Sequence, residues 1–308
     1  MSYKLGEIPS PKASFDEKAD YLEIKCLKSE TLMYSIQEAA SASRIVTDED
    51  YSEKIVEELP YYEELRVIDD RKKQCGGNYP FLTDSEVWGL YASQESVYIH
   101  TMYTYLLLAT RNDMGRNRIV DGVDGGKLFE RLCSLVLKNY FGEHCHSFVF
   151  GTGDDAHTNF KARLQNFLEQ VNEPKTQVVP IREGIEHTQD DALDVVVNIP
   201  FGDKRSCQFM AFCQCKTGDN WKNSIVLLSP SNFSRCYFNP PLHFTPIIVH
   251  MVTEAYNFDW YHVTRDVVFF DRCRIMRYLP SEEMLLEKDA HLISEIRTWN
   301  NGILQQIS

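Results

Sequence analysis

The sequence predicts an α/β fold in which a mixed β-sheet is flanked by helices and preceded by a mainly helical N-terminal region. Two observations support this prediction. Helical and β-rich patterns succeed one another after residue 126, whereas helical periodicity dominates before residue 110. A chain of 308 residues, 43% of them hydrophobic, is long enough to bury the core of one large domain or two smaller ones.

The N-terminal half carries three helical patterns followed by a segment typical of a connection. Glu30–Ala42 and Glu86–Ala109 have apolar residues at near-helical spacing, and Glu53–Leu59 is a shorter candidate that ends at Pro60. Arg111–Gly126 is rich in Gly, Asp and Asn, which favours a linker.

We therefore expect a division of the chain near residue 115. Residues 1–115 would form an accessory region for oligomerisation or partner docking, and residues 116–308 would form the functional domain.

The second half contains the sharper patterns. Apolar stripes predict helices, and β-branched or apolar runs predict strands, the first two of them joined as a hairpin through the turn residues Gly202 and Asp203. The expected helices are Lys127–Phe141, His157–Val171 and Ser281–Thr298, and the expected strands are 192–199, 208–215, Thr245–Thr253 and Asp266–Phe270.

Composition narrows the functional classes. The nine cysteines are odd in number, scattered and without a CxxC pair, which favours reduced thiols over a disulfide framework. No apolar run is long enough to span a membrane and no leader pattern precedes residue 12, so we expect a cytoplasmic protein. The net charge of −13 argues against an autonomous, high-affinity binder of nucleic acid.

Four residues form a pattern that suits phosphodiester hydrolysis. Asp194 begins a β-branched run, Gln214 and Lys216 lie two apart on the returning strand, and Glu130 lies early in an amphipathic helix. A carboxylate and other oxygen ligands suit Mg²⁺ or Mn²⁺, which activates water and stabilises the leaving oxygen. A lysine beside that water stabilises the developing negative charge.

The segments GKLFERLCSLVLKNYFG, ALDVVV and FCQCKTG resemble the PD-(D/E)XK restriction-endonuclease-like superfamily. Within it, they are most similar to the members with a Gln-x-Lys signature, such as Mrr-type restriction enzymes and nucleases of bacterial antiviral systems. The resemblance covers roughly residues 120–275. It implies a restriction-endonuclease-like mixed sheet and a metal-dependent DNA endonuclease.

The resemblance also implies a role for each matching residue. Asp194 would be the central metal ligand, Lys216 the catalytic lysine and Glu130 the helix carboxylate. Gln214 stands where most members have Asp or Glu, and the Cys215 backbone carbonyl would be a further ligand. Leu193 replaces the proline that precedes the aspartate in the family pattern.

Other interpretations of the same residues remain open. Glu130 alone is typical of a solvated helix face, Asp194 of a strand start, and Lys216 of an exposed sheet edge. Trp221 and Lys222 follow the motif and are candidates for substrate contact, with packing equally favoured for the tryptophan.

Two hypotheses follow for the function. The first is a Mg²⁺-dependent endodeoxyribonuclease of a prokaryotic restriction or antiviral system, in which a homo-oligomer, a partner ATPase or a sensor protein compensates the acidic charge. The second is a nuclease-like subunit that has lost catalysis and acts in binding or assembly, which the neutral side chain of Gln214 favours.

Overall fold

The computed structural model describes residues 5–46, 62–84, 89–150, 160–173, 175–179, 192–203, 205–218, 220–223, 228–257 and 265–307. The helices in these ranges are α1 (Phe15–Lys28), α2 (Ile36–Val46), α3 (Tyr62–Gln74), α4 (Val97–Arg111), α5 (Gly125–Phe141), α6 (Phe160–Gln170), α7 (Pro230–Tyr237), α9 (Arg272–Arg277), α10 (Glu282–Lys288) and α11 (Leu292–Gln306), with a 3₁₀ turn at Asn220–Asn223.

The strands form one large sheet and three small ones. They are β1 (Met33–Ser35), β2 (Phe81–Asp84), β3 (Gly89–Ala92), β4 (Ile119–Val120), β5 (Val123–Asp124), β6 (His146–Val149), β7 (Gln177–Val178), β8 (Val195–Ile199), β9 (Phe209–Lys216), β10 (Phe238–Asn239), β11 (Ile247–Val252) and β12 (Val268–Phe270).

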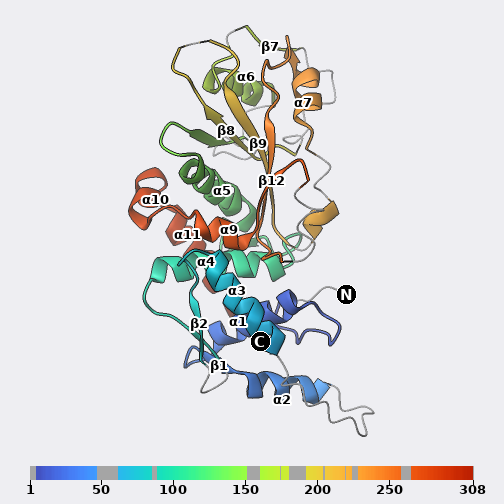
Figure 1. The fold of residues 1–308 in the computed structure, drawn as a ribbon, viewed down its shortest axis with the longest axis vertical. Coiled ribbons are helices and arrows are strands. Elements are labelled where there is room, and N and C mark those ends of the chain that lie inside the picture. Colours follow the sequence, from blue (N-terminus) through green and yellow to red (C-terminus); the bar gives the residue numbers. More distant parts are fainter. Residues whose placement is uncertain are drawn as a thin grey trace.

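The large sheet has five strands in the order β12-β11-β9-β8-β6 (Figure 1). Its β6, β8 and β9 are antiparallel neighbours, whereas β9, β11 and β12 run parallel. The prediction of a mixed sheet flanked by helices is therefore confirmed, and so is the hairpin of β8 and β9. The start of β8 and the ends of β9, β11 and β12 consequently meet at one edge of the sheet.

Each face of this sheet is buried under different helices. Alternate residues of β9 separate the two sides, because Ala211 and Cys213 pack in one hydrophobic cluster with α5, whereas Met210 and Phe212 pack in another with α6 and α7. The cluster that includes α5 also contains residues of α1, α4, α9 and α11. We call these two sides the α5 face and the α6 face.

Local sequence signals explain the helix that begins the second half. Asp124 caps α5 by accepting hydrogen bonds from the backbone N–H groups of Gly126 and Lys127, and Gly142 follows its last residue with a positive φ of 91°. The predicted helix at Lys127–Phe141 is confirmed and begins two residues earlier, at Gly125. The predicted helix at His157–Val171 is confirmed as α6 within its described residues.

Two predicted helices each contain a strand. Glu30–Ala42 contains strand β1 before α2, which starts after Ser35, and Ser35 exchanges hydrogen bonds with Glu38 in the first turn of the helix. Glu86–Ala109 contains β3, the central strand of the sheet β1-β3-β2, and α4 begins only after the cap Ser96. The strands pair with partners far along the chain, which helical periodicity does not reveal.

The C-terminal helical prediction at Ser281–Thr298 is divided into α10 and α11. The break lies at Asp289, whose carboxylate accepts two hydrogen bonds from Arg131 of α5 at 2.8 and 2.7 Å and one from the Leu292 N–H at 3.1 Å. A tertiary ion pair thus fixes the helix boundary. The short helix expected at Glu53–Leu59 lies outside the described residues.

The segment expected to be a linker is an ordered connection. Within Arg111–Gly126, β4 and β5 form a small antiparallel ladder. Trp299 of α11 donates a hydrogen bond to the Arg118 carbonyl, and Tyr105 of α4 donates one to the Gly125 carbonyl. The hydrophobic cluster of the α5 face therefore runs through the expected division at residues 115 and 116. The N-terminal helices lie beside α9 and α11 rather than apart from them (Figure 1).

A buried ionic network joins the N-terminal helix to the rest of the molecule. Asp20 of α1 accepts hydrogen bonds from Arg111 at 2.6 Å and Arg272 at 2.8 Å, and its carboxylate lies 2.8 Å from Arg71. Glu23, one turn later, contacts Arg71 and Arg272 as well as the hydroxyls of two buried tyrosines. Burial alone would raise the pKa of Asp20, but the three guanidinium groups lower it well below its ordinary value.

We expect Asp20→Asn to destabilise the protein strongly. The substitution removes the negative charge that three buried guanidinium groups share, and breaking a buried pair in this way costs about 3–5 kcal/mol. Urea denaturation of the full chain measures the loss. Asp70→Asn is the matched control, because Asp70 pairs with Lys73 on an exposed helix surface and should change stability by less than about 1 kcal/mol. Equal stability of the two variants would contradict the role assigned to the network.

Candidate functional site

The candidate site lies at the edge of the large sheet where β8 begins and β9 ends. Asp194 precedes β8, and its backbone N–H donates to the Cys213 carbonyl at 3.0 Å. Two residues further along β9, the Cys215 N–H donates a hydrogen bond to Oδ2 of the Asp194 side chain at 2.6 Å, where a backbone carbonyl would accept it in a regular ladder. These two hydrogen bonds hold Asp194 at the open end of the hairpin, opposite its turn, and 7% of the residue's surface is exposed.

The electrostatics of Asp194 are unusual for an aspartate. Burial raises its pKa well above the ordinary value, and the nearby negative groups of Cys215 and Glu130 raise it further. The hydrogen bond from the Cys215 N–H and the charge of Lys216 act in the opposite direction. Of the predicted site residues, Asp194, Glu130 and Lys216 are therefore close enough to influence one another.

Glu130 and Lys216 reach this edge from different elements. Glu130 lies on α5, whose neighbouring residues Phe129 and Leu132 anchor the helix in the hydrophobic cluster. Lys216 is the last residue of β9, and both side chains are partly exposed. A helix carboxylate, a strand carboxylate and a lysine thus surround one end of the hairpin.

A group of three cysteines lies directly beside Asp194 on the α5 face. Cys213 and Cys215 have their Sγ atoms 3.9 Å apart, and the Cys133 thiol of α5 hydrogen-bonds with that of Cys215. Burial opposes ionisation of Cys215, but the hydrogen bonds from Cys133 and Cys213 and the charge of Lys216 lower its pKa to about 5. All nine cysteines of the chain are free thiols in the structure, as expected. Sequence reasoning did not anticipate this group, because Cys133 is remote in the chain.

Gln214 is more deeply buried than the other three predicted site residues. It follows Met210 and Phe212 in the alternation of β9, so its side chain leaves the strand on the α6 face, as that of Lys216 does, opposite to Cys213 and Cys215. It is completely buried, and within the described part of the chain neither its Nε2 nor its Oε1 has a hydrogen-bond partner. Its neighbour in the parallel register is His250 of β11, which is also buried.

The residues after β9 have a structural role. Trp221 is 2% exposed and packs with Val252, Tyr256 and Phe269, so packing rather than substrate contact accounts for it. Its indole N–H donates to Glu254, a buried carboxylate just beyond β11. Lys222 is exposed, and its Nζ lies 4.8 Å from the centre of the Tyr256 ring. Glu254 follows an apolar strand without any motif, which explains why the sequence did not reveal it.

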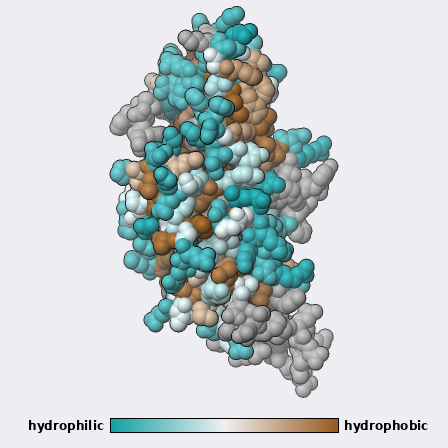
Figure 2. Space-filling model, turned by 60° about the vertical axis from the view of Figure 1, so that its left-hand side comes forward, coloured by the Kyte–Doolittle hydropathy of each residue, from teal (hydrophilic) through white to brown (hydrophobic). Residues whose placement is uncertain are grey.

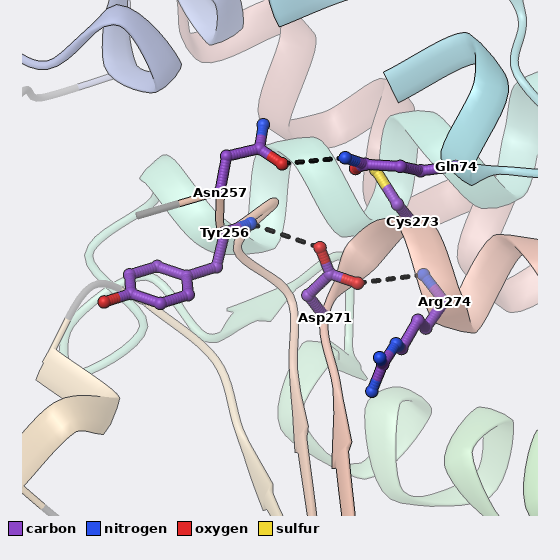
Figure 3. A pocket seen from close by; sticks show the side chains of 6 residues that line it. All are labelled: Gln74, Tyr256, Asn257, Asp271, Cys273 and Arg274. Atoms are coloured by element: carbon purple, nitrogen blue, oxygen red, sulfur yellow. Dashed lines mark hydrogen bonds between the residues drawn. The ribbon is translucent and has the colours of Figure 1, made fainter. Parts of the chain in front are cut away.

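A pocket occupies the same edge of the sheet at the ends of β11 and β12 (Figure 3). It has a volume of about 290 Å³ and is lined by Gln74, Tyr256, Asn257, Asp271, Cys273 and Arg274. Asp271 accepts hydrogen bonds from the N–H groups of Tyr256 and Arg274, and Gln74 donates to Asn257 (Figure 3). These polar groups hydrogen-bond with one another, and none of the predicted site residues lines the pocket.

The comparisons with known proteins come out negative. No family model matches the chain, and no curated protein or solved structure shows significant similarity to it. Among the described residues, no helix is long and apolar enough to cross a membrane. One face of the molecule is mostly hydrophilic, with separate apolar areas (Figure 2).

The donor set at Asp194 fits a hard cation in part. Two carboxylates, of Asp194 and Glu130, are oxygen donors of the kind that Mg²⁺ prefers. Burial is the main cause of the raised pKa of Asp194, and the negative groups of Cys215 and Glu130 add to it. The Cys215 carbonyl points to the same side of its strand as the N–H that binds Asp194. Gln214 is buried on the side of β9 that also carries Lys216, and in the described ranges no three His, Cys, Asp or Glu side chains converge closely enough to hold a metal.

We expect Gln214→Met to preserve or increase stability by about 1 kcal/mol, because it removes buried polar groups that have no partner. Gln208→Met is the matched control. Gln208 is equally buried, but its side chain accepts from the Phe201 N–H and donates to the Arg205 carbonyl. Its loss should cost about 1–3 kcal/mol in urea denaturation. A Gln214→Met variant that loses as much as Gln208→Met would show that Gln214 has partners in solution.

Proposed function

We propose that this chain is a metal-dependent nuclease that hydrolyses phosphodiester bonds in DNA, with Asp194, Glu130 and Lys216 as its functional groups. The observation that carries the proposal is the position of Asp194, a buried carboxylate at the mouth of a β-hairpin whose pKa responds to both Glu130 and Lys216. A site of this composition supplies the three requirements of phosphodiester hydrolysis, namely oxygen ligands, a positive side chain and access from solvent.

The architecture supports a restriction-endonuclease-like core. The chain runs from the helix with Glu130, through β6, to the strand after Asp194 and back along the strand that ends at Lys216. The next strand of the sheet, β11, lies parallel to β9 after the helix α7. This order of helix carboxylate, strand carboxylate and strand lysine is the one that the Asp194 and Gln-x-Lys motifs imply.

The roles follow from the environment of each group. Asp194 and Glu130 would hold a Mg²⁺ or Mn²⁺ ion through carboxylate oxygens, with the Cys215 carbonyl as a further donor. When bound, the ion would supply Lewis acidity that lowers the pKa of water and offsets charge on the phosphate. The Lys216 ammonium group would hydrogen-bond to the attacking water and to a non-bridging phosphate oxygen. In-line attack of the water oxygen on phosphorus would break the bond to the leaving oxygen, with the water proton passing to solvent and the leaving oxygen taking up a proton from solvent.

Gln214 is assigned no catalytic role in this proposal. Its side chain is neutral and fully buried, so the proposed site has one acidic ligand fewer on β9 than the family pattern implies. The charge of −13 also leaves little attraction for a polyanion at physiological salt. For both reasons we propose that cleavage depends on a partner protein or on an oligomer that holds the DNA.

We expect Lys216→Ala to lower the rate of Mg²⁺-dependent DNA cleavage by at least about 100-fold, because it removes the charge that stabilises the transition state. Asp194→Ala should abolish cleavage. Single-turnover assays on linear and single-stranded DNA, with and without candidate partner proteins, measure both effects. Lys288→Ala, which removes an exposed lysine on α10, is the matched control and should cleave at the wild-type rate. Wild-type activity in the Lys216 variant would refute the proposal.

The environment of Gln214 also favours a second candidate, in which the chain is a catalytically inactive nuclease-fold subunit that acts in assembly. Calorimetric titration with Mn²⁺ separates the two candidates. The nuclease proposal expects saturable binding that Asp194→Ala removes and a concentration-dependent rise in Tm for the wild type alone. Equal titration curves for the wild type and the variant would favour the assembly subunit.

A further inference from the structure

A pocket separate from the candidate nuclease site lies beside β12, an outer strand of the large sheet in the described part of the chain. Its volume is about 390 Å³, which is in the range of small-molecule sites. Tyr140 lines it from the last turn of α5, ten residues after Glu130, which corresponds to about 15 Å along a helix. The other lining residues come from β12, from α9 and its C-cap, and from the end of α3, and they are Gln74, Val268, Phe270, Arg274, Arg277 and Tyr278.

Two arginines supply the charge of this pocket. Arg274 and Arg277 lie three residues apart on α9 and are both exposed, and no carboxylate from the described residues lines the pocket. Arg274 also borders the pocket of Figure 3, and its Nη1 donates to the Phe269 carbonyl at 2.7 Å.

Arg277 has donors to spare for a ligand. Its Nη1 donates to the Gln74 carbonyl at 3.3 Å, and within the described ranges no Asp or Glu forms an ion pair with it. A guanidinium group has five N–H donors, so this single bond leaves further ones directed at solvent or a ligand. The pocket therefore favours an anion, although the chain as a whole carries a net charge of −13.

Aromatic rings border the arginines. Tyr140 is 41% exposed, and its ring centre lies 5.1 Å from that of Phe270 and 4.8 Å from that of Tyr278, both in edge-to-face geometry. The side chain of Asn139 donates to the Tyr278 carbonyl at 3.0 Å, which joins the end of α5 to the end of α9. Tyr140 thus presents a supported ring surface next to the two guanidinium groups.

The two features together specify the chemistry of a ligand. A phosphate monoester carries a charge of about −1.5 to −2 at neutral pH and three acceptor oxygens, which match two guanidinium groups better than one carboxylate does. Planar bases stack on exposed aromatic side chains and on guanidinium planes. An aliphatic anion would leave the rings unused, and a neutral ring compound would leave the arginines unused. A nucleotide contains both the phosphate and the planar base.

We propose that this pocket binds a nucleoside monophosphate. The phosphate accepts hydrogen bonds from Arg277 and Arg274, and the base packs on the ring of Tyr140. A free mononucleotide and the 5′-phosphorylated end of a nucleic-acid strand share this chemistry. The inference does not depend on the nuclease proposal, because Asp194, Glu130 and Lys216 do not line the pocket.

Isothermal titration calorimetry of the full chain, without divalent metal, tests the inference with dAMP, deoxyadenosine, inorganic phosphate and phenyl phosphate. We expect saturable binding of dAMP and affinities at least about tenfold lower for the other three probes, because each of them lacks the phosphate or the base. A 5′-phosphorylated tetradeoxyadenylate then distinguishes the sources. Tighter binding than that of dAMP identifies a strand end as the ligand, and weaker binding identifies the free nucleotide.

Substitutions locate the binding to the pocket. Arg277→Gln removes one positive charge and should weaken dAMP binding by about tenfold or more. Tyr140→Leu retains an apolar side chain without the ring, so it should weaken dAMP binding by about fivefold or more and leave the weak binding of inorganic phosphate unchanged. It also provides a second test if Arg277→Gln is unstable. Arg297→Gln changes an exposed arginine of α11 outside the pocket, and this matched control should bind as the wild type does.

Three results would overturn the inference. The first is the absence of saturable binding of both dAMP and the tetranucleotide at concentrations up to about ten millimolar, where even weak specific sites are occupied. The second is that any of the three other probes binds as tightly as dAMP, since the pocket would then not recognise a nucleotide as a whole. The third is unchanged affinity in both the Arg277→Gln and the Tyr140→Leu variants. The cleavage assay of Lys216→Ala is unaffected by these results, so the two proposals stand or fall separately.

Discussion

The carboxylate of Asp20 is the point on which the arrangement of the molecule depends. Three arginines from α3, α4 and the start of α9 converge on it, and none of the four side chains is more than marginally exposed. Buried guanidinium groups are tolerated only when their charge is matched, so the packing of α4 and α9 depends on the position of α1. The helix α4 then approaches the end of β9, where the Ala109 carbonyl accepts a hydrogen bond from the Gly218 N–H. The N-terminal region is thus a structural support for the edge that carries Asp194 and Lys216.

Polar residues meet at that edge of the sheet because of the directions of its strands. The antiparallel hairpin puts the beginning of β8 beside the end of β9, and the parallel pairs put the ends of β11 and β12 in line with it. A polar residue lies at each strand end there: Asp194 before β8, Lys216 at the end of β9, Glu254 beyond β11 and Asp271 after β12. Open α/β sheets commonly bind ligands at the carboxyl ends of their strands. Because Asp194 is buried at this edge, its charged form is disfavoured and its pKa is raised.

The parts of the fold that sequence predicts are those with local causes. The helix α5 has its own cap and apolar stripe, and the β8–β9 hairpin has two apolar runs around a turn, so both were anticipated nearly residue by residue. Strands β1 and β3 escaped because their pairing joins residues such as Met33 and Tyr91, and α1 escaped because its buried face includes Asp20 and Glu23. No local pattern identifies an acidic residue as buried when its partners are distant in the chain. The same reasoning explains why Cys133, Cys213 and Cys215 were not expected to meet.

The sequence likewise predicts only part of the candidate site. Period-two alternation gives Gln214 and Lys216 a common side of β9, but it does not say which helix covers that side. The hydrophobic clusters supply this information, and they separate Gln214 from the cysteines and from α5. The open end of the hairpin therefore has three groups that can carry negative charge, two carboxylates and a thiol, and one lysine that carries positive charge. Burial and the neighbouring negative groups both raise the pKa of Asp194, and the positive charge of Lys216 opposes them. In the proposed nuclease, Asp194 and Glu130 would therefore be the acidic metal ligands.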